Sequence, residues 1–237
     1  MAAPPTIPGS AALPEPNPAI PPLENGDRLT RAEFERRYDA MPHLKKAELI
    51  DGVVYMPSPV RFDRHAEQHG QLVTWAGYYV AFTPGVRSGD NASTRLNEQN
   101  EPQPDLAMFV DSATLSVAQV DSEGYLAGSP DLLGEVAASS VSIDLGAKFQ
   151  AYRGAGVREY IVWRVLDKAL DWYILRGSDY MLLEPGSDGI LRSGVFPGLW
   201  LDRAAMLGGN LARVLEVLQQ GLQSPEHAAF VAKIRPA

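Results

Sequence analysis

The middle of the chain holds two apolar stretches, at 103–110 and 131–137, whose patterns predict neighbouring β-strands. Side chains alternate between the two faces of a strand. Asp105 therefore lies on one face of the first strand, and Glu135 and Ala137 share a face of the second. If the strands pair with the two acids level and on the same side, their carboxylates converge on one point. Such a pair, together with water and substrate phosphate, is a typical binding site for Mg²⁺.

An amphipathic pattern after the second strand predicts a helix that starts near Ile143 and ends at the glycines Gly154 and Gly156. Lys148 falls within the apolar stripe of this helix, beside Asp144. One explanation is that Lys148 buries its stem and reaches water, or pairs with Asp144. The other is that its ammonium reaches toward the two strand carboxylates, where it orients an attacking water and offsets charge on phosphate. The acids on the neighbouring strands favour the second explanation.

Helices are expected at three further places. Thr30 and Glu33 form a capping-box pattern, which starts a helix of about three turns. Residues 61–82 have the longest helical pattern, and a last amphipathic helix begins at Asn210, its cap. The apolar stripe of this last helix suits packing inside the subunit or against a second subunit, so a homodimer is one alternative.

Short strands account for most of the remaining pattern. A hairpin at 44–55 turns at Asp51 and Gly52, a dipeptide typical of two-residue loops. The strand at 159–163 is expected to run parallel to its predecessor, through the intervening helix. Residues 111–130 are polar and punctuated by Gly and Ser, so a helical piece and loops are expected there. Further strands are expected at 86–96, where a turn divides them, and at 170–175, 180–183 and 199–201.

Together these elements predict an α+β (mixed α/β) domain with a central mixed β-sheet, flanking helices and extra antiparallel strands. The chain of 237 residues is long enough to bury a sizeable core in one domain. Residues 1–27 hold eight of the 19 prolines, so we expect a disordered arm there. The expected organisation is therefore an arm at 1–27, a single domain at 28–222 and a C-terminal tail at 223–237.

Composition and charge limit the kinds of site and partner that we expect for this chain. The chain has no cysteine, which excludes disulfides and thiolate metal sites and fits a reducing cytoplasm. It has neither an 18-residue apolar run nor a signal-peptide pattern, so we expect a cytoplasmic protein without a membrane partner. The formal net charge of −8 counts against nucleic-acid binding. However, a metal site is itself acidic, and a local basic surface can coexist with a negative total.

Three other residues are candidates for the site. Glu48 in the hairpin could project toward the acids, although an exposed strand glutamate is the commoner case. His65 and His69 share a helical face, as zinc-binding histidines do. The glutamate between them is one place too late for the metalloprotease pattern, and no third ligand is evident. The sequence therefore argues against a zinc protease.

Several short motifs occur in an order and at a spacing that resemble a known family. They are Glu48 to Gly52, Met56 to Pro59, His65, Pro104-Asp105, Leu132 to Val136, Asp144 to Lys148, Tyr152 to Tyr160 and Pro197 to Leu199. This order resembles the Uma-type restriction endonuclease family, in the superfamily with a Pro-Asp…(Asp/Glu)-x-Lys signature, and it covers about 45–205. The resemblance implies a restriction-endonuclease-like core and an endonuclease acting on nucleic acid, with DNA as the expected substrate and Mg²⁺ or Mn²⁺ as the cofactor.

The resemblance also implies roles for single residues. Asp105 and Glu135 bind the metal, and the backbone carbonyl of Ala137 is a further ligand. Ala137 stands where the superfamily signature has lysine, and Lys148 matches a helix lysine that substitutes for it in the resembled family. His65 matches a histidine often found in that family, which suggests substrate contact or proton transfer, with a structural hydrogen bond as the alternative.

Two other functions stay open. The acidic charge and the missing strand lysine fit a binding or assembly module that keeps a nuclease-like scaffold without catalysis, because a fold does not determine a function. A hydrolase of small phosphoesters is a further alternative. DNA cleavage that depends on a divalent metal, on Asp105 and on Lys148 would favour the endonuclease.

Overall fold

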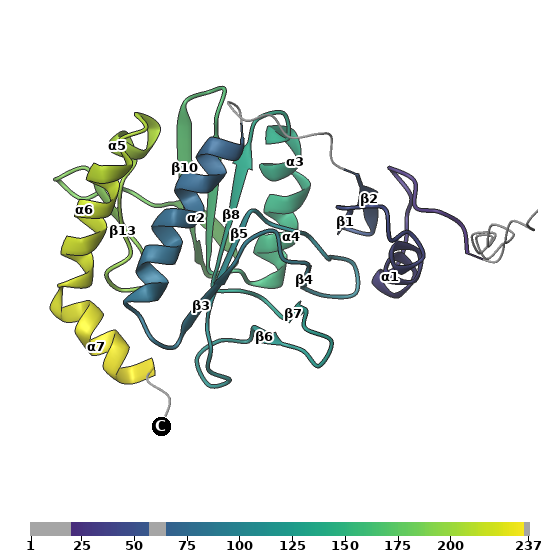
Figure 1. Ribbon diagram of the computed structural model, residues 1–237, viewed down its shortest axis with the longest axis horizontal. Helices are drawn as coiled ribbons and strands as arrows, with labels where there is room; N and C mark the ends of the chain where they lie inside the picture. Colours follow the sequence, from purple (N-terminus) through teal and green to yellow (C-terminus); the bar gives the residue numbers. More distant parts are fainter. Residues whose placement is uncertain (1–19, 57–64, 235–237) are drawn as a thin grey trace, which may run out of the picture.

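The centre of the fold is a six-stranded mixed sheet, drawn in the middle of Figure 1. The computed structural model describes residues 20–56 and 65–234. In order across the sheet, the strands are β11 (Asp179–Leu182), β10 (Ala169–Arg176), β9 (Glu159–Arg164), β8 (Leu132–Ala137), β5 (Leu106–Val110) and β3 (Val86–Gly89). Strands β8 and β9 run parallel, as expected, and all other neighbours in this sheet are antiparallel.

Helices cover both faces of the sheet (Figure 1). One face carries α2 (Ala66–Ala81), α5 (Arg203–Leu207), α6 (Leu211–Leu222) and α7 (Pro225–Ile234). The other carries α3 (Val141–Asp144) and α4 (Ala147–Ala155). Helix α1 (Arg31–Asp39) and the hairpin of β1 (Glu48–Ile50) and β2 (Val53–Tyr55) form an N-terminal lobe, residues 20–56, whose β1 strand contacts α4. The result is a mixed α+β fold, as the sequence predicts.

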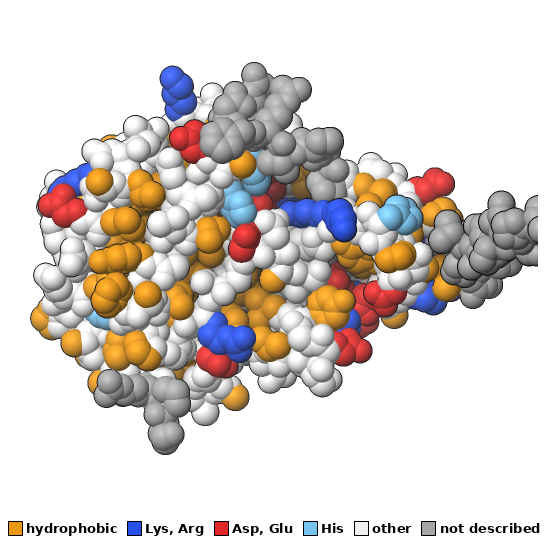
Figure 2. All heavy atoms as spheres, in the orientation of Figure 1, with side chains coloured by type: hydrophobic (Ala, Val, Ile, Leu, Met, Phe, Trp, Pro, Cys, Tyr) orange, Lys and Arg blue, Asp and Glu red, His pale blue; other side chains and the backbone are white. Residues whose placement is uncertain are grey.

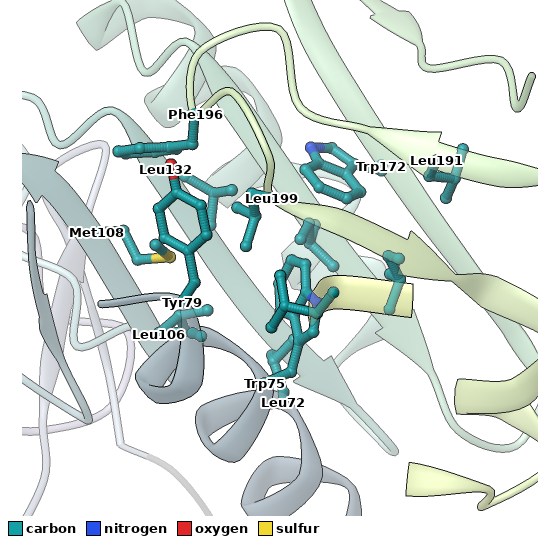
Figure 3. Packing of buried hydrophobic residues seen from close by; sticks show 14 of the residues in the cluster. Leu72, Trp75, Tyr79, Leu106, Met108, Leu132, Trp172, Leu191, Phe196 and Leu199 are labelled. Carbon is teal, nitrogen blue, oxygen red and sulfur yellow. The ribbon is translucent and has the colours of Figure 1, made fainter. Parts of the chain in front are cut away.

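The core between the sheet and α2 is rich in aromatic side chains (Figure 3). Trp75 of α2 lies edge-to-face against Trp172 of β10, with ring centroids 5.7 Å apart. Tyr79, one turn later, lies edge-to-face against Phe196 and donates its hydroxyl to the carbonyl of Pro197 at 2.9 Å. Such rings bury a large apolar area, and their edge-to-face contacts add about 0.5–1.5 kcal/mol each. Helix α2 is therefore fixed against the sheet along its length.

Alternation along β5 separates the two faces of the sheet. Leu106 and Met108 pack in the core under α2, whereas Ala107 and Phe109 pack in a second cluster on the side of α4. On β8, Ala137 belongs to the second cluster too. The face assignments made from period-two alternation are thus confirmed, and they direct the acidic residues of both strands toward α4.

Several sequence expectations are confirmed in detail. The hairpin turn has Asp51 and Gly52 at φ of 51° and 70°, the left-handed conformation that suits a two-residue loop. Asn210 accepts the N–H of Arg213 and caps α6. Helix α6 packs against α2 inside the chain, so its apolar stripe is buried without a second subunit. No helix in the described ranges is long and apolar enough to span a bilayer.

Other expectations need correction. Residues 111–130, all of which the structure describes, form no helix. They contain the short strands β6 (Gln119–Val120) and β7 (Leu126–Ala127), which form a small sheet with β4 (Thr94–Arg95). Only the Thr30 half of the capping box forms, because the Glu33 carboxylate pairs with Arg36 and Arg37 instead. Strand β12 (Ile190–Arg192), which pairs with β13 (Trp200–Asp202), was not anticipated.

The C-terminal segment and the start of α2 also differ from expectation or lie partly outside the described residues. The segment 223–237, expected as a tail, includes helix α7, in which His227 and Ile234 are buried. Helix α2 begins at Ala66, and residues 57–64, the start of the expected helix 61–82, lie outside the described residues. The arm expected at 1–27 lies mostly outside them as well, although Leu23 is buried in the N-terminal lobe.

Candidate functional site

Asp105 and Glu135 lie opposite each other on neighbouring strands. The antiparallel pairing of β5 with β8 matches Leu106 to Gly134, so the residue before Leu106 stands level with the residue after Gly134. Side chains that are opposite in an antiparallel pair lie on the same face, with Cβ atoms about 4.5–5.5 Å apart. The carboxylate of Asp105 also accepts the backbone N–H of Val136 at 2.8 Å, which joins it to β8 directly. The level, same-face arrangement expected from the sequence is present.

His65, the residue before α2, and His69, in the first turns of α2, both contact Asp105. His65 Nε2 lies 3.2 Å from Asp105 Oδ2, and His69 Nε2 lies 3.0 Å from the backbone oxygen of Asp105. Burial acts to raise the pKa of Asp105, but the hydrogen bond and charge of His65 and the N–H of Val136 outweigh it, so the pKa lies below its usual value. Asp105 is thus held ionised in a buried position. His65 and His69 bind Asp105 and Asp90 rather than forming a zinc helix.

Lys148 lies at the centre of a buried acidic cluster. Its Nζ is 2.9 Å from Glu48 Oε1, 3.0 Å from Glu135 Oε1 and 3.8 Å from Asp144 Oδ1. The residue is only 4% exposed, so the ammonium does not snorkel to water. Burial acts to lower the pKa of Lys148, but the three carboxylates raise it well above its usual value. Lys148 therefore stays charged. Its ammonium pairs with Asp144, as the first sequence explanation allows, and with the strand residue Glu135, as the second expects.

Glu48 and Glu135 are both fixed by more than this lysine. Glu48 Oε1 also accepts the backbone N–H of Gln103 at 2.7 Å, so the hairpin is tied to the segment that leads into Asp105. Glu135 Oε1 also accepts the hydroxyl of Tyr152 at 2.7 Å. Burial raises the pKa of Glu135 to about 8, Lys148 opposes this shift, and the neighbouring acids add to it.

The carbonyl groups of β8 point alternately to its two neighbours. The backbone oxygen of Ala137, expected as a metal ligand, accepts the N–H of Val165 at 3.0 Å and so points toward β9. Val136 directs its N–H to the Asp105 carboxylate, on the β5 side. Because the N–H and C=O of one strand residue point to the same neighbour, the Val136 carbonyl lies on the side of Asp105. The position next to the acids thus belongs to Val136 rather than to Ala137.

The donor atoms suit a hard divalent ion. Mg²⁺ and Mn²⁺ prefer carboxylate, carbonyl and water oxygens. Within the described residues, Asp105 Oδ1 and Glu135 Oε2 accept no hydrogen bond, so each carboxylate has one oxygen without a partner there. In residues 20–56 and 65–234, no group of three or more His, Cys, Asp or Glu side chains is arranged to hold an ion. Since Mg²⁺ is commonly held by one or two carboxylates plus water and substrate phosphate, two carboxylates and a carbonyl still fit it.

Comparison with protein families places the chain. A family model described as "Putative restriction endonuclease" matches residues 31–204. The chain belongs to the Uma2 family. The match includes every element that contributes to the Asp105–Lys148 cluster. No curated protein matches the chain.

A solved structure supports the fold assigned to this Uma2 chain. The chain is similar to a crystal structure described as "a putative nuclease belonging to DUF820 from Anabaena variabilis ATCC 29413", with a TM-score of 0.55 and 14% sequence identity. The similarity covers 73% of this chain and 97% of the other. At this identity the comparison shows a shared fold.

The structure brings together all the side chains that the sequence nominated in this Uma2 chain, and it adds others. Asp105, Glu135, Lys148, Glu48 and His65 lie in one connected network. The sequence interpretation missed the contribution of Tyr152, because an aromatic residue in an apolar helical stripe usually indicates core. Its position one turn after Lys148 is the signal that could have found it.

Proposed function

We propose that this Uma2 chain is a metal-dependent endonuclease that hydrolyses phosphodiester bonds in nucleic acid, with DNA as the expected substrate. The observation that carries the proposal is the buried network in which Asp105 and Glu135 stand level on one face of the sheet and Lys148 lies 3.0 Å from Glu135. Two carboxylates beside a charged lysine are the groups that metal-assisted attack of water on phosphate requires. Family membership supports the same reaction class.

Each residue has a role that its contacts support. Asp105 and Glu135 supply carboxylate oxygens for Mg²⁺ or Mn²⁺, and the Val136 carbonyl takes the place that the resemblance gave to Ala137. When bound, such an ion lowers the pKa of a coordinated water and offsets charge on the phosphate. Lys148 has three N–H donors, of which Glu48 and Glu135 engage two. Asp144 lies 3.8 Å away, beyond hydrogen-bond distance, so the third donor can orient the attacking water.

Glu48 and His65 act through these groups. Glu48 holds the Lys148 ammonium from the hairpin side, and His65 fixes Oδ2 of Asp105. Since Oδ2 also accepts the Val136 N–H, the unengaged oxygen of Asp105 has a defined direction. His65 is thus a positioning residue for Asp105 in this proposal.

The test is cleavage of supercoiled plasmid and single-stranded DNA with Mg²⁺, with Mn²⁺ and with EDTA. We expect metal-dependent cleavage by the natural chain and a loss of at least about 100-fold in Asp105→Asn and Glu135→Gln, the scale of a lost catalytic group. Asp111→Asn, an exposed acid beyond the other end of β5, is the matched control and keeps full activity. Cleavage that survives Asp105→Asn would point to a contaminating nuclease and refute the proposal.

Lys148→Ala needs a check on folding. It leaves three buried carboxylates without their cation, a change that typically costs about 3–5 kcal/mol of stability. Urea unfolding of this variant is therefore measured beside Lys45→Ala, an exposed lysine. Loss of cleavage in Lys148→Ala counts for the proposal only where the variant is folded under the assay conditions.

A binding or assembly module without catalysis is the second candidate. It is favoured by the neutralisation of Glu48 and Glu135 by Lys148, which satisfies both carboxylates without a metal, and by the net charge of −8. Nucleic acid that is bound but never cut under any of the metal conditions would support this candidate instead.

A further inference from the structure

A nuclease site rich in carboxylates must also attract an anionic substrate. In the described part of the chain most arginines are already paired with acids: Arg31, Arg36, Arg37, Arg87, Arg95, Arg153, Arg158, Arg164, Arg192 and Arg213. Their charge is therefore largely used within the protein. A cation that binds phosphate is best sought among groups near Asp105 that have no carboxylate partner.

Lys46 has this combination of features. Ala47 and Leu49 point into the core of the N-terminal lobe, so by strand alternation Lys46 and Glu48 face the opposite side, toward the site. Lys46 Nζ donates to the side-chain oxygen of Asn91 at 2.9 Å, and it makes no ion pair with any residue in 20–56 or 65–234. The turn that holds Asn91 connects Lys46 to the site through hydrogen bonds.

The turn between β3 and β4 fixes the position of Lys46. Asn91 adopts a left-handed conformation with φ of 50°, and its side-chain amide donates to Asp90 Oδ1 at 2.6 Å. Asp90 in turn lies 2.8 Å from His69 Nε2, and His69 contacts the backbone of Asp105. One turn therefore places Lys46 relative to the metal-binding residues. In Figure 2, basic side chains lie beside imidazole side chains on the face between α2 and the β1–β2 hairpin.

We propose that Lys46 binds a backbone phosphate of the nucleic acid beside the Asp105–Glu135 pair. This inference rests on the proposed function and names the residue that positions its substrate. An ammonium has three donors and Asn91 engages one, so two remain for phosphate oxygens. The partner Asn91 is neutral, so among the described residues no carboxylate pairs with Lys46, and binding a phosphate breaks no ion pair with them. Such a contact is independent of base sequence.

The experiment measures binding of a fluorescent DNA duplex in EDTA as a function of salt, so that no cleavage occurs. The variants are Lys46→Gln, Lys46→Arg and the matched control Lys45→Gln, which removes the same charge from the adjacent exposed position. We expect Lys46→Gln to weaken binding alike for unrelated sequences. It should also reduce the slope of log K against log salt by about 0.9, the value for one lost phosphate contact. Lys46→Arg and Lys45→Gln keep the natural slope.

Outcomes separate this inference from the proposed function. Equal slopes in Lys46→Gln and Lys45→Gln overturn the role of Lys46 and leave the nuclease proposal standing if the natural chain cleaves DNA. If the natural chain binds DNA without cutting it, the nuclease proposal is refuted. The slope of log K against log salt for Lys46→Gln then still decides the role of Lys46. Absence of any DNA binding overturns both.

Discussion

Asp105 and Glu135 face each other but have opposite electrostatic settings. Asp105 is held ionised, with a pKa below its usual value, by His65 and a backbone N–H, although burial opposes this. Burial raises the pKa of Glu135 to about 8, and Lys148 is the group that opposes the shift. The charge on Glu135 therefore depends on Lys148, whereas that on Asp105 depends on His65 and the N–H of Val136.

A third buried acid, Glu159, gives a pH prediction that is independent of the site. It lies on the opposite face of the sheet, where its carboxylate accepts the backbone N–H groups of Gly194 and Val195 and the Ser193 hydroxyl. Burial raises its pKa to about 7 despite these bonds. Between the usual glutamate pKa, about 4.5, and about 7, the folded chain binds more protons than the unfolded chain. The contribution of Glu159 to the free energy of unfolding therefore falls by about 3 kcal/mol as pH rises through this window.

Urea unfolding of the natural chain and of Glu159→Gln at pH 5, 6, 7 and 8 measures this contribution. The stability difference between the two should shrink steadily up to about pH 7 and then level off. Glu226→Gln, at an exposed position in α7, is the control and shows no such trend. A difference that does not change with pH would mean that Glu159 is ionised throughout.

Some residues of the site can be predicted from the sequence and others cannot. Lys148 could be nominated because a lysine in an apolar stripe conflicts with the usual pattern, and the conflict drew attention to the site. Tyr152 could not, because its pattern agrees with plain core packing. The choice between Val136 and Ala137 depends on which neighbour each carbonyl faces. That direction is set by strand pairing, which no local pattern reveals.

At the scale of elements, the break between α3 and α4 determines where Lys148 lies. Helix α3 ends at Asp144, and α4 starts at Ala147 after Gly146. A Cβ atom at Gly146 would fall on the carbonyl oxygen of Ser142, so only glycine fits this approach of the two helices. The sequence pattern predicted one continuous helix because the apolar stripe runs across the break.

Gly146, just before α4, and Gly154, in its last turn, provide a matched pair of substitutions. Gly146→Ala should cost about 1–3 kcal/mol of stability, as overpacking does, and should reduce DNA cleavage because α4 and Lys148 must shift. Gly154→Ala, where a Cβ meets no atom within 4 Å, should gain about 0.5–1 kcal/mol and keep cleavage. Urea unfolding and the plasmid assay measure both effects. If both variants gained stability, the break at Gly146 would not be needed to form the site.

The sequence predicts helices and strands correctly where the hydrophobic period is clear, and the prediction fails where the period is absent. The sheet strands and α2 have strong patterns and were found within a few residues. The two-residue strands β6 and β7 are too short for a period; β7 pairs with β4, which is distant in sequence, and β6 pairs with β7. Helix α7 was missed for a related reason: its burial depends on contacts such as His227 with Thr83, which is distant in sequence.

For the whole molecule, the candidate site lies where three hydrophobic clusters meet. The large cluster under α2 and the cluster under α4 sandwich the sheet, and the third cluster forms the small core of the N-terminal lobe. Glu48 comes from this lobe, whereas Asp105, Glu135 and Lys148 come from the sheet and α4. The lobe joins the rest through Glu48, through Lys46, through the paired backbone groups of Leu49 and Glu101, and through ion pairs such as Arg31 with Glu98 and Glu35 with Arg95. Its stability therefore bears directly on the site.

This arrangement predicts that the N-terminal lobe opens more easily than the sheet. Phe34 is fully buried in the small cluster, and Phe34→Ala removes a contact worth about 3–5 kcal/mol. We expect amide hydrogen exchange to quicken in β1 and β2 while β8 and β9 keep the natural rates, because opening of a local unit does not require global unfolding. Phe196→Ala, in the cluster under α2, is the control and should quicken exchange in β8 and β9 as well.

The variant Phe34→Ala also tests how the stability of the lobe affects DNA cleavage. If the lobe opens in Phe34→Ala, Glu48 leaves Lys148, and the ammonium is then held by Glu135 and Asp144 alone. Cleavage of DNA should fall in proportion to the open fraction and recover when an uncharged osmolyte such as sucrose is added, because osmolytes favour burial of apolar surface. Equal acceleration of exchange in β1, β2, β8 and β9 would show that the lobe and the sheet unfold as one unit. In that case Glu48 is as firmly placed as the strand acids themselves.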